Sequence, residues 1–406
     1  MTRRRGSLVC LTTSAAFGGA ETSLLTLLGA LRRHEPSLAI SIVAPASGPL
    51  VERCRALDLD AGVLPYPQPL RALGETAATG IGSAGSARVR FVARGLLAAA
   101  ALPRYVTGLR RALRERGATV VHSNGLKAHV AAALAKPAGV RLVWHLHDYV
   151  RGRPLSTQLL RRLAHRADAI VANSDSVMAD ARDVLGSGAP LLRIYNAVDL
   201  AAFSPDGPRA DVDGLARMPR DDGRLRVGLV ATFARWKGHQ VFIEAISRMK
   251  YRHRVRGYIV GGAVYQTPGS QWTLDELRQA ARSHGVAGEI GFTGHVADVP
   301  PVLRALDVLV HASTAPEPFG MAIAEGMACG RAVIAARSGG AAELFEERLD
   351  AIGHEPGNAA QLADALDELA SDSGLRARLG DAARAAACRK FGADRMAAEF
   401  AKVYSG

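Results

Sequence analysis

The sequence is poor in cysteine, in aromatic residues and in long apolar runs. Its four cysteines, in 406 residues, form no CxxC pair and no cluster with histidine, which excludes a disulfide scaffold and a cysteine-based metal site. We therefore expect reduced thiols in a cytoplasmic protein. No apolar run approaches the roughly 20 residues that a membrane-spanning helix needs. Aromatic residues make up 5% of the chain, and without an aromatic-rich platform, zinc module or helix-turn-helix pattern we expect no nucleic-acid partner.

The N-terminus is short of the continuous apolar core that a signal peptide requires. Residues 2–5 are basic and GGA at 18–20 is a run of small residues, but Thr12, Thr13 and Ser14 interrupt the apolar centre. A signal peptide needs an unbroken apolar stretch between its charged start and its cleavage site. We therefore expect a first β-strand at 7–13 that runs into a glycine turn.

Positive charge is in excess, and it is unevenly placed. The chain carries a formal net charge of +13, and residues 1–200 hold 26 Lys and Arg against 13 Asp and Glu, so that 26 − 13 accounts for the whole excess. A one-sided positive field favours anionic partners, such as a phospholipid surface or a pyrophosphate. The basic stretch 88–116 is expected to be a helix that Pro103 breaks or kinks. It is suited either to an anionic membrane surface or to a solvated face of a core-packed helix.

Apolar strands alternate with helical segments throughout the chain, which predicts parallel α/β sheets covered on both faces. A stretch rich in Pro, Asp and Gly without apolar period, 201–223, separates two such series and is expected to be a linker. The predicted domains are a first α/β domain at 1–200, a second α/β domain at 224–390 and a C-terminal helix at 391–406 that crosses back to the first domain. The expected strands are at 7–13, 38–45, 61–66, 119–124, 141–148, 169–174 and 191–199, then at 226–233, 258–262, 290–296, 307–313 and 332–340.

Polar residues gather where the strands of the first domain end. In open α/β sheets ligands bind at the carboxyl ends of the strands, so this clustering indicates a site. A single histidine there is more often structural, but four strand ends in succession carry His or Asn. The residues are His122, Asn124, His145, His147, Asp148, Asn173, Ser174, Asn196 and Asp199.

Two glutamates frame an expected helix start in the second domain. Glu317 lies in a turn bracketed by prolines, and Glu325 follows eight positions later on a helix that should open at Phe319 and Gly320. The free N–H groups and the positive dipole end of that helix would lie between the two carboxylates. This arrangement is suited to an anion flanked by hydroxyl groups, such as the diphosphate of a nucleotide-sugar. The plain alternative is a capped loop-to-helix junction with a solvated Glu325.

Two cations stand at another expected helix start. Arg235 and Lys237 occupy a short turn before Gly238, where they would stabilise a diphosphate leaving group, although an RxK turn is also a common solvated turn. The acid pairs DLD (58–60) and DVD (211–213) resemble the carboxylates that bind a divalent metal on diphosphates. They lack supporting ligands, so we expect both pairs to be surface acids.

Eight short segments occur in a fixed order along nearly the whole chain: GGAE (18–21), HLHD (145–148), NSDS (173–176), YNAVD (195–199), ARWKG (234–238), GFTGHV (291–296), EPFGMAIAE (317–325) and SGGAAE (338–343). This ordered set resembles that of the family 4 glycosyltransferases, which include bacterial mannosyl- and N-acetylglucosaminyltransferases. The resemblance implies the GT-B fold, in which two Rossmann-like domains with parallel sheets face each other across a cleft, and a retaining transfer of sugar. It also implies that residues 1–200 form the acceptor-side domain and residues 224–390 the nucleotide-sugar-binding domain.

The resemblance also implies roles for individual residues. Glu317 would contact hydroxyls of the donor sugar and Glu325 the ribose, while Arg235 and Lys237 would hold the diphosphate. His147 resembles the active-site histidine of the family. His145 would share its face of the strand, so geometry alone does not exclude it, but the adjoining Asp148 favours His147. The backbone at Phe319, Gly320 and Met321 would approach sugar and phosphate, and Gly18 and Gly19 would offer N–H groups to the phosphate and acceptor side.

The implied activity is transfer of a hexosyl or N-acetylhexosaminyl group from a nucleotide-diphosphate sugar to an acceptor hydroxyl, in polysaccharide or glycolipid biosynthesis. No metal or other cofactor is expected, and the nucleotide-sugar is a co-substrate. The acceptor would be a glycan, a lipid-linked sugar or a small molecule, and the enzyme would be cytoplasmic or peripheral on the inner face of the cell membrane. Two alternatives stay open at this point: a GT-B-fold phosphorylase or nucleotide-sugar epimerase, and a basic membrane-surface binding protein without enzymatic activity.

Overall fold

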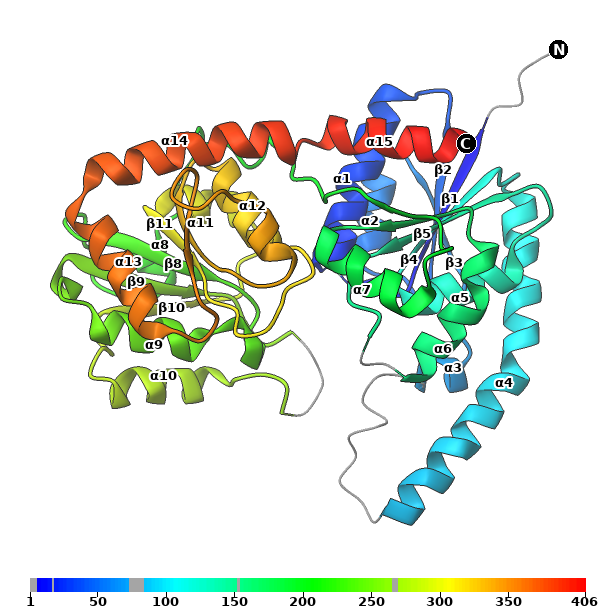
Figure 1. Ribbon diagram of the computed structural model, residues 1–406, viewed down its shortest axis with the longest axis horizontal. Coiled ribbons are helices and arrows are strands. Elements are labelled where there is room, and N and C mark those ends of the chain that lie inside the picture. The colour runs from blue at the N-terminus through cyan, green and yellow to red at the C-terminus, as the bar shows by residue number, and fades with distance from the viewer. Residues whose placement is uncertain (1–5, 17, 73–83, 152–153, 265–268) are drawn as a thin grey trace. The chain divides into compact units, whose positions relative to one another are not determined.

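The computed structural model describes residues 6–16, 18–72, 84–151, 154–264 and 269–406. Two compact units emerge: unit 1 contains residues up to Tyr195 together with Asp394–Gly406, and unit 2 contains Asn196–Ala393. Each unit is an α/β unit built on one parallel sheet (Figure 1). The predicted fold class of two Rossmann-like domains is therefore confirmed. None of the helices in the described residues combines the length and the hydropathy needed to cross a membrane.

Unit 1 contains a parallel sheet of seven described strands in the order β3-β2-β1-β4-β5-β6-β7. The chain moves outward in one direction from β1 to β3 and then returns to the other side of β1, so the order reverses between β1 and β4. The strands are β1 (Ser7–Thr12), β2 (Ala39–Ala44), β3 (Asp60–Val63), β4 (Val120–Asn124), β5 (Arg141–Leu146), β6 (Ala169–Ala172) and β7 (Leu191–Arg193).

The helices of unit 1 lie along the sheet, and the last one comes from the far end of the chain. On one sheet face, Leu142 and Trp144 of β5 pack in an apolar cluster with Leu109 and Leu113 of α4. The helix α4 begins at Ala84 and continues through Pro103, so the expected break is absent. The helices are α1 (Gly19–His34), α2 (Pro49–Ala56), α3 (Gln68–Ala72), α4 (Ala84–Glu115), α5 (Leu126–Ala135), α6 (Pro154–Leu163), α7 (Asp175–Leu185) and α15 (Ala393–Ser405).

Unit 2 repeats this plan with six described strands in the order β10-β9-β8-β11-β12-β13, and the order reverses between β8 and β11. The sequence did not indicate β13, which is only three residues long. The strands are β8 (Leu225–Val230), β9 (Val255–Val260), β10 (Ile290–Gly294), β11 (Val308–His311), β12 (Ala332–Ala336) and β13 (Ile352–His354). The helices are α8 (Val212–Leu215), α9 (His239–Arg248), α10 (Leu274–Ser283), α11 (Val299–Ala305), α12 (Met321–Ala328), α13 (Ala359–Ser371) and α14 (Ser373–Lys390).

Local sequence signals account for where several of these helices begin. Thr273 and Glu276 form a capping box at α10, in which each side chain satisfies a backbone N–H group of the first turn. Ser174, Asn358 and Asp372 each accept a hydrogen bond from the first turn of α7, α13 and α14 respectively. Gly238 and Gly320 precede α9 and α12 in left-handed backbone conformations, which glycine adopts without steric cost.

The stretch 201–223, expected to be a linker, belongs to unit 2, and a buried acid attaches it there. Asp213 is 1% exposed, and its carboxylate accepts hydrogen bonds from Arg256 and Tyr258, both at 2.6 Å. Arg256 and Tyr258 are two positions apart on β9 and thus share one sheet face. The expectation of surface acids is therefore correct for Asp211, which is exposed, but wrong for Asp213.

The four cysteines and the acid pair Asp58 and Asp60 are found as the sequence predicted, the first as free thiols and the second as surface acids. All four cysteines are free thiols, three of them buried, while Cys388 is exposed. Burial raises the pKa of Cys54 and Cys329 to about 11, so these two thiols stay protonated at neutral pH. Asp58 and Asp60 are exposed, and Asp60 forms an ion pair with Arg116.

We expect Asp213→Asn to lower the free energy of unfolding of unit 2 by about 3–5 kcal/mol, because it removes the charge that the buried guanidinium of Arg256 meets at 2.6 Å and leaves only the more distant Asp221, at 3.4 Å, to pair with it. The matched control is Asp211→Asn, two positions earlier, where asparagine still caps α8. Chemical denaturation followed by circular dichroism measures both changes. Equal unfolding midpoints for the two variants would contradict this role of Asp213.

Candidate functional site

The predicted cations and acids of unit 2 follow the two strands at which the strand order reverses. Lys237 ends a 3-10 turn after β8, and Glu317 lies in the loop after β11. At such a reversal the connections leave toward opposite faces of the sheet, and the strand ends between them stay accessible to a ligand. The structure brings these two residues into contact although they are 80 positions apart.

Glu317 is a buried carboxylate whose oxygen Oε1 meets three donors. It is 5% exposed, and Lys237 donates a hydrogen bond from Nζ at 2.7 Å. His311 Nε2 lies 2.8 Å from the same oxygen, and Ser313 donates to it through Oγ. We call Lys237, His311, Ser313 and Glu317 the carboxylate cluster.

The carboxylate cluster keeps Glu317 ionised. Burial alone would favour the neutral acid, but the charge and hydrogen bonds of Lys237 and His311 outweigh it and hold the pKa of Glu317 well below its usual range. An ionised carboxylate only accepts hydrogen bonds, so Nε2 of His311 carries the proton in this contact. Because Oε1 already accepts three hydrogen bonds, it is suited to electrostatic stabilisation and positioning.

Arg235 is two residues from Lys237, but its guanidinium has other partners. It lies 3.8 Å from the centre of the Trp272 ring, donates to the carbonyl of Gly269 at 2.9 Å and pairs with Glu276 at 3.1 Å. The sequence placed both cations at one diphosphate. The structure places Lys237 in the carboxylate cluster and Arg235 on the α10 side of the turn.

The two glycines at the helix starts permit close backbone approaches. A Cβ atom on Gly238 would overlap the carbonyl oxygen of Ala312, so only glycine lets the start of α9 lie against the end of β11. Gly320 precedes α12 with φ of 101°, as the sequence led us to expect of the helix opening. Phe319 is itself buried against Phe391, with ring centres 5.8 Å apart, while Met321 at the first helical position is partly exposed.

Glu325 is the second predicted acid, and its environment is opposite to that of Glu317. It lies on α12, and among the described residues its carboxyl group has no hydrogen-bond or ion-pair partner. Burial raises the pKa of Glu325 to about 7. The two glutamates therefore differ in charge near neutral pH, one held ionised and the other near half protonation.

In unit 1, the glycines Gly18 and Gly19 lie exposed at the start of α1, after β1. The carboxyl group of Glu21 turns back to this helix start. Its burial raises its pKa, and hydrogen bonds from the backbone of Glu21 and Gly18 partly oppose that shift. An anion at these glycines would therefore compete with a carboxyl group of the chain itself.

The rings of His147 and His145 are in contact at the end of β5, with their centres 3.9 Å apart and their planes tilted by 46°. His145 is completely buried, whereas His147 lies just past the last strand residue and is partly exposed. Burial lowers the pKa of His147 to about 3, so its imidazole is neutral at neutral pH. His147 is thus the more exposed residue of the two, although both nitrogens of each ring are buried.

Sequence reasoning missed His311 and Ser313. Both lie at the end of an apolar run, DVLVHAS, which reads as an ordinary buried strand. The usable signal was their position, since His311 ends β11 and Ser313 follows it, as polar residues follow the strands of unit 1.

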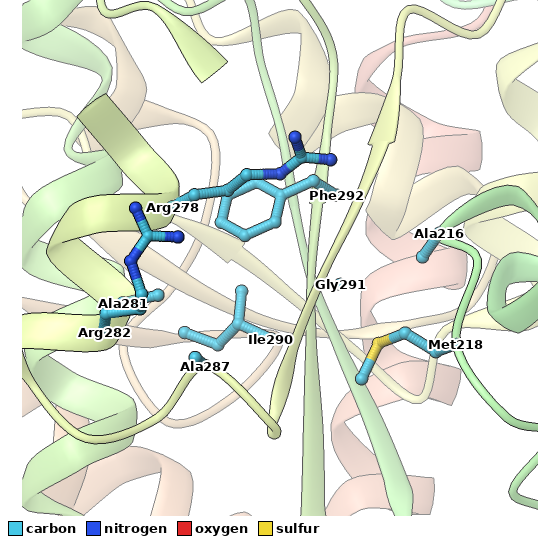
Figure 2. Close-up of a pocket in the computed structure, with 9 residues that line it drawn as sticks. All are labelled: Ala216, Met218, Arg278, Ala281, Arg282, Ala287, Ile290, Gly291 and Phe292. Carbon is cyan, nitrogen blue, oxygen red and sulfur yellow. The ribbon is translucent and has the colours of Figure 1, made fainter. Parts of the chain in front are cut away.

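A separate cavity of about 260 Å³ lies at the β10 edge of unit 2 (Figure 2). Arg278 and Arg282 of α10 line one side, Met218 lies opposite, and Ile290 and Phe292 of β10 contribute apolar surface. None of the predicted site residues lines this cavity. No group of three or more His, Cys, Asp or Glu side chains arranged to bind a metal ion occurs in the part of the chain that the structure describes.

Comparison with known families matches the two units to two sequence models. Residues 17–202 match the family described as Glycosyltransferase Family 4, and residues 216–386 match Glycosyl transferases group 1. The break between the two matches falls inside the stretch 201–223 that the composition singled out.

Individual relatives agree with these families. The D-inositol 3-phosphate glycosyltransferase of Salinispora arenicola is 30% identical over 68% of this chain, and the match spans 62% of that enzyme's length. The GDP-mannose-dependent alpha-(1-6)-phosphatidylinositol monomannoside mannosyltransferase of Mycobacterium tuberculosis is 29% identical over 69% of this chain and 71% of its own.

Among solved structures, Anabaena HepE in complex with UDP-glucose matches with a TM-score of 0.78 and 25% identity, covering 98% of this chain and 99% of HepE. The cyanobacterial sucrose-phosphate synthase of Thermosynechococcus elongatus matches with a TM-score of 0.76 at 18% identity, which concerns the fold alone. The carboxylate cluster, the two parallel sheets and these matches lead to one assignment. The chain belongs to the family 4, group 1 glycosyltransferases of the GT-B fold.

Proposed function

We propose that the protein is a retaining glycosyltransferase that moves a hexosyl or N-acetylhexosaminyl group from a nucleotide-diphosphate sugar to an acceptor hydroxyl. The observation that carries the proposal is the carboxylate cluster, a buried ionised glutamate paired with a lysine at the strand-order reversal of unit 2. The names of similar proteins support the donor class, since HepE was solved with UDP-glucose and the mycobacterial relative is GDP-mannose-dependent.

In the proposed reaction, unit 2 binds the donor. The sugar hydroxyls meet Glu317, and the ribose meets Glu325. The ammonium group of Lys237 and the start of α12 face the diphosphate, whose negative charge grows as the glycosidic bond breaks. Arg235 contributes less than Lys237, because Trp272 and Glu276 already hold its guanidinium.

Retention is proposed to follow from front-side attack by the acceptor hydroxyl, assisted by the departing phosphate. In this mechanism Glu317 positions the donor sugar and stabilises charge. It is less suited to act as a covalent nucleophile, because three donors already share its Oε1. His147 on unit 1 would contribute a neutral imidazole that hydrogen-bonds substrate, since its lowered pKa excludes a charged acid near pH 7. No metal ion takes part in the proposed reaction.

The proposed setting is synthesis of a cell-surface glycan or glycolipid, with the enzyme at the cytoplasmic side. The relatives named for phosphatidylinositol mannoside and inositol phosphate substrates support this class of acceptor. The net positive charge of residues 1–200 supports contact with an anionic membrane surface. Co-sedimentation with anionic vesicles at low salt tests that contact, and its absence would remove the membrane part of the proposal.

We expect Lys237→Gln to reduce sugar transfer about 10²-fold or more, because it removes the cation that faces both Glu317 and the leaving group. The matched control, Arg235→Gln, lies two residues away and should reduce transfer by about tenfold or less. Initial rates of nucleotide release and formation of the glycosylated acceptor measure both. Equal losses in the two variants would contradict this division of roles.

The same assay tests the other two residues. Glu317→Gln keeps the shape of the side chain but not its charge, and we expect a loss of about 10²-fold or more in transfer rate. His147→Ala should also reduce transfer sharply while the fold is retained. A folded Glu317→Gln/Lys237→Gln/His147→Ala variant that transfers at the wild-type rate would refute the proposed site. Consumption of phosphate in place of nucleotide release would identify a phosphorylase.

Donor affinity should depend on pH through Glu325. With its pKa near 7, the carboxylate that accepts hydrogen bonds from the ribose is mostly ionised at about pH 8 and only about one-tenth ionised at about pH 6. Binding of UDP-glucose or GDP-mannose should therefore weaken by up to about tenfold across this range, because their phosphates do not titrate there. Calorimetric titration should show no such trend for Glu325→Gln, and an identical trend would remove Glu325 from the binding site.

A further inference from the structure

We propose that the helix α15 positions the imidazole of His147 through a row of aromatic rings in tilted or edge-on contact. The row runs from Phe400 through His145 to His147, with His122 beside it, and all four residues belong to unit 1. This inference rests on the proposed function, in which His147 meets substrate. It assigns positioning roles to Phe400 and Tyr404, which neither the sequence analysis nor the family resemblance had singled out.

The row lies on one face of the sheet of unit 1. His145 on β5 pairs in register with Asn124 on β4, two positions after His122, and side chains alternate between faces along a strand. His122, His145 and His147 therefore share one face, while Trp144 points to the other. His129 belongs to that opposite side, where its ring stacks on Trp144 and its Nδ1 meets Ser123 Oγ at 2.7 Å.

The helix α15 covers the histidine face (Figure 1). Phe400 is completely buried, with its ring centre 5.0 Å from that of His145 and 5.3 Å from that of His122. Tyr404 lies one helical turn later, and its hydroxyl is 2.8 Å from His122 Nδ1. Side chains four positions apart lie on the same stripe of a helix, so these two rings meet the histidines together.

Ring contacts are the main constraint on His145 and His147. Both ring nitrogens of His145 and both of His147 are buried without a hydrogen-bond partner in the described residues. An imidazole is usually oriented by a hydrogen bond to one of its nitrogens. Here the ring of His145, held between Phe400, His122 and His147, supplies that orientation through packing.

Other contacts attach α15 without touching the row. Arg395 donates to the carbonyl of Tyr195 at 2.7 Å, and Arg141 donates to that of Val403 at 2.6 Å. Asp394 pairs with His34 at 2.7 Å near the start of the helix. Anchoring of α15 and contact with the histidines can therefore be altered separately, which makes a controlled test available.

The test compares Phe400→Leu, which removes the ring but keeps an apolar side chain, with Arg395→Gln, which weakens anchoring and leaves the row intact. The full chain is labelled at histidine, and the imidazole signals of His145 and His147 are followed by NMR. Steady-state transfer is measured in parallel. If Phe400→Leu does not fold, Tyr404→Phe, which removes only the hydroxyl next to His122, takes its place with the same measurements.

We expect Phe400→Leu to shift the signals of His145 and His147 and to lower kcat about tenfold, with KM for the donor within about twofold of wild type. Arg395→Gln should leave both the signals and kcat close to wild type. The proposal is overturned if Phe400→Leu leaves the His147 signal in place, if the signal moves without a change in kcat, or if Arg395→Gln lowers kcat equally.

Failure of this inference is distinguishable from failure of the proposed function. If the wild-type chain transfers no sugar from any donor, the proposed function fails. The NMR comparison still decides whether α15 holds the ring of His147. An unchanged donor KM in Phe400→Leu further separates the two, because Lys237, Glu317 and Glu325, which the proposed reaction assigns to the donor, lie in unit 2.

Discussion

The reversal of strand order within each parallel sheet is the constraint on which the site depends. Between β8 and β11, and between β1 and β4, the strand order reverses, and at such a reversal the connections leave toward opposite faces and the strand ends stay accessible to a ligand. Lys237 follows β8 and Glu317 follows β11, while Gly18 follows β1. The position of the reversal therefore determines where polar groups can meet a ligand, and the loops after these three strands supply most of them.

Burial of the ionised carboxylate of Glu317 is energetically unfavourable, and the ion pair and hydrogen bonds around it offset this penalty. A buried ion pair is often no more stable than well-packed apolar residues of similar volume. The chain nevertheless places a lysine, a histidine and a serine around one carboxylate oxygen. Such an arrangement is better explained by a need for a fixed negative charge than by a need for stability. Glu325 on the helix α12 has no such surroundings, and burial raises its pKa to about 7.

The fold was largely predictable because apolar strands alternate with helices along the whole chain. The strand β13 was not predicted, because three residues are too few to show the alternation of apolar and polar side chains that identifies a strand. Lys237 and Glu317 could be found since each lies in a distinctive turn. His311 and Ser313 could not, because a strand that reads DVLVHAS looks like core. Asp213 was misjudged for the opposite reason. Its partners are on β9, more than 40 positions later, and no local pattern in a stretch rich in Pro, Asp and Gly reveals a burial that depends on a distant strand.

The membership of α15 in unit 1 has a consequence for biosynthesis. A ribosome makes the strands of unit 1 first, but the helix that covers His122 and His145 leaves the ribosome only after all of unit 2. Domains generally fold as units during synthesis, N-terminal first. In unit 1, however, the sheet face that carries His122 and His145 stays uncovered until α15 has been made. The nascent chain thus completes its second unit before its first, because α15, which follows unit 2 in the chain, is needed to cover the histidines of unit 1.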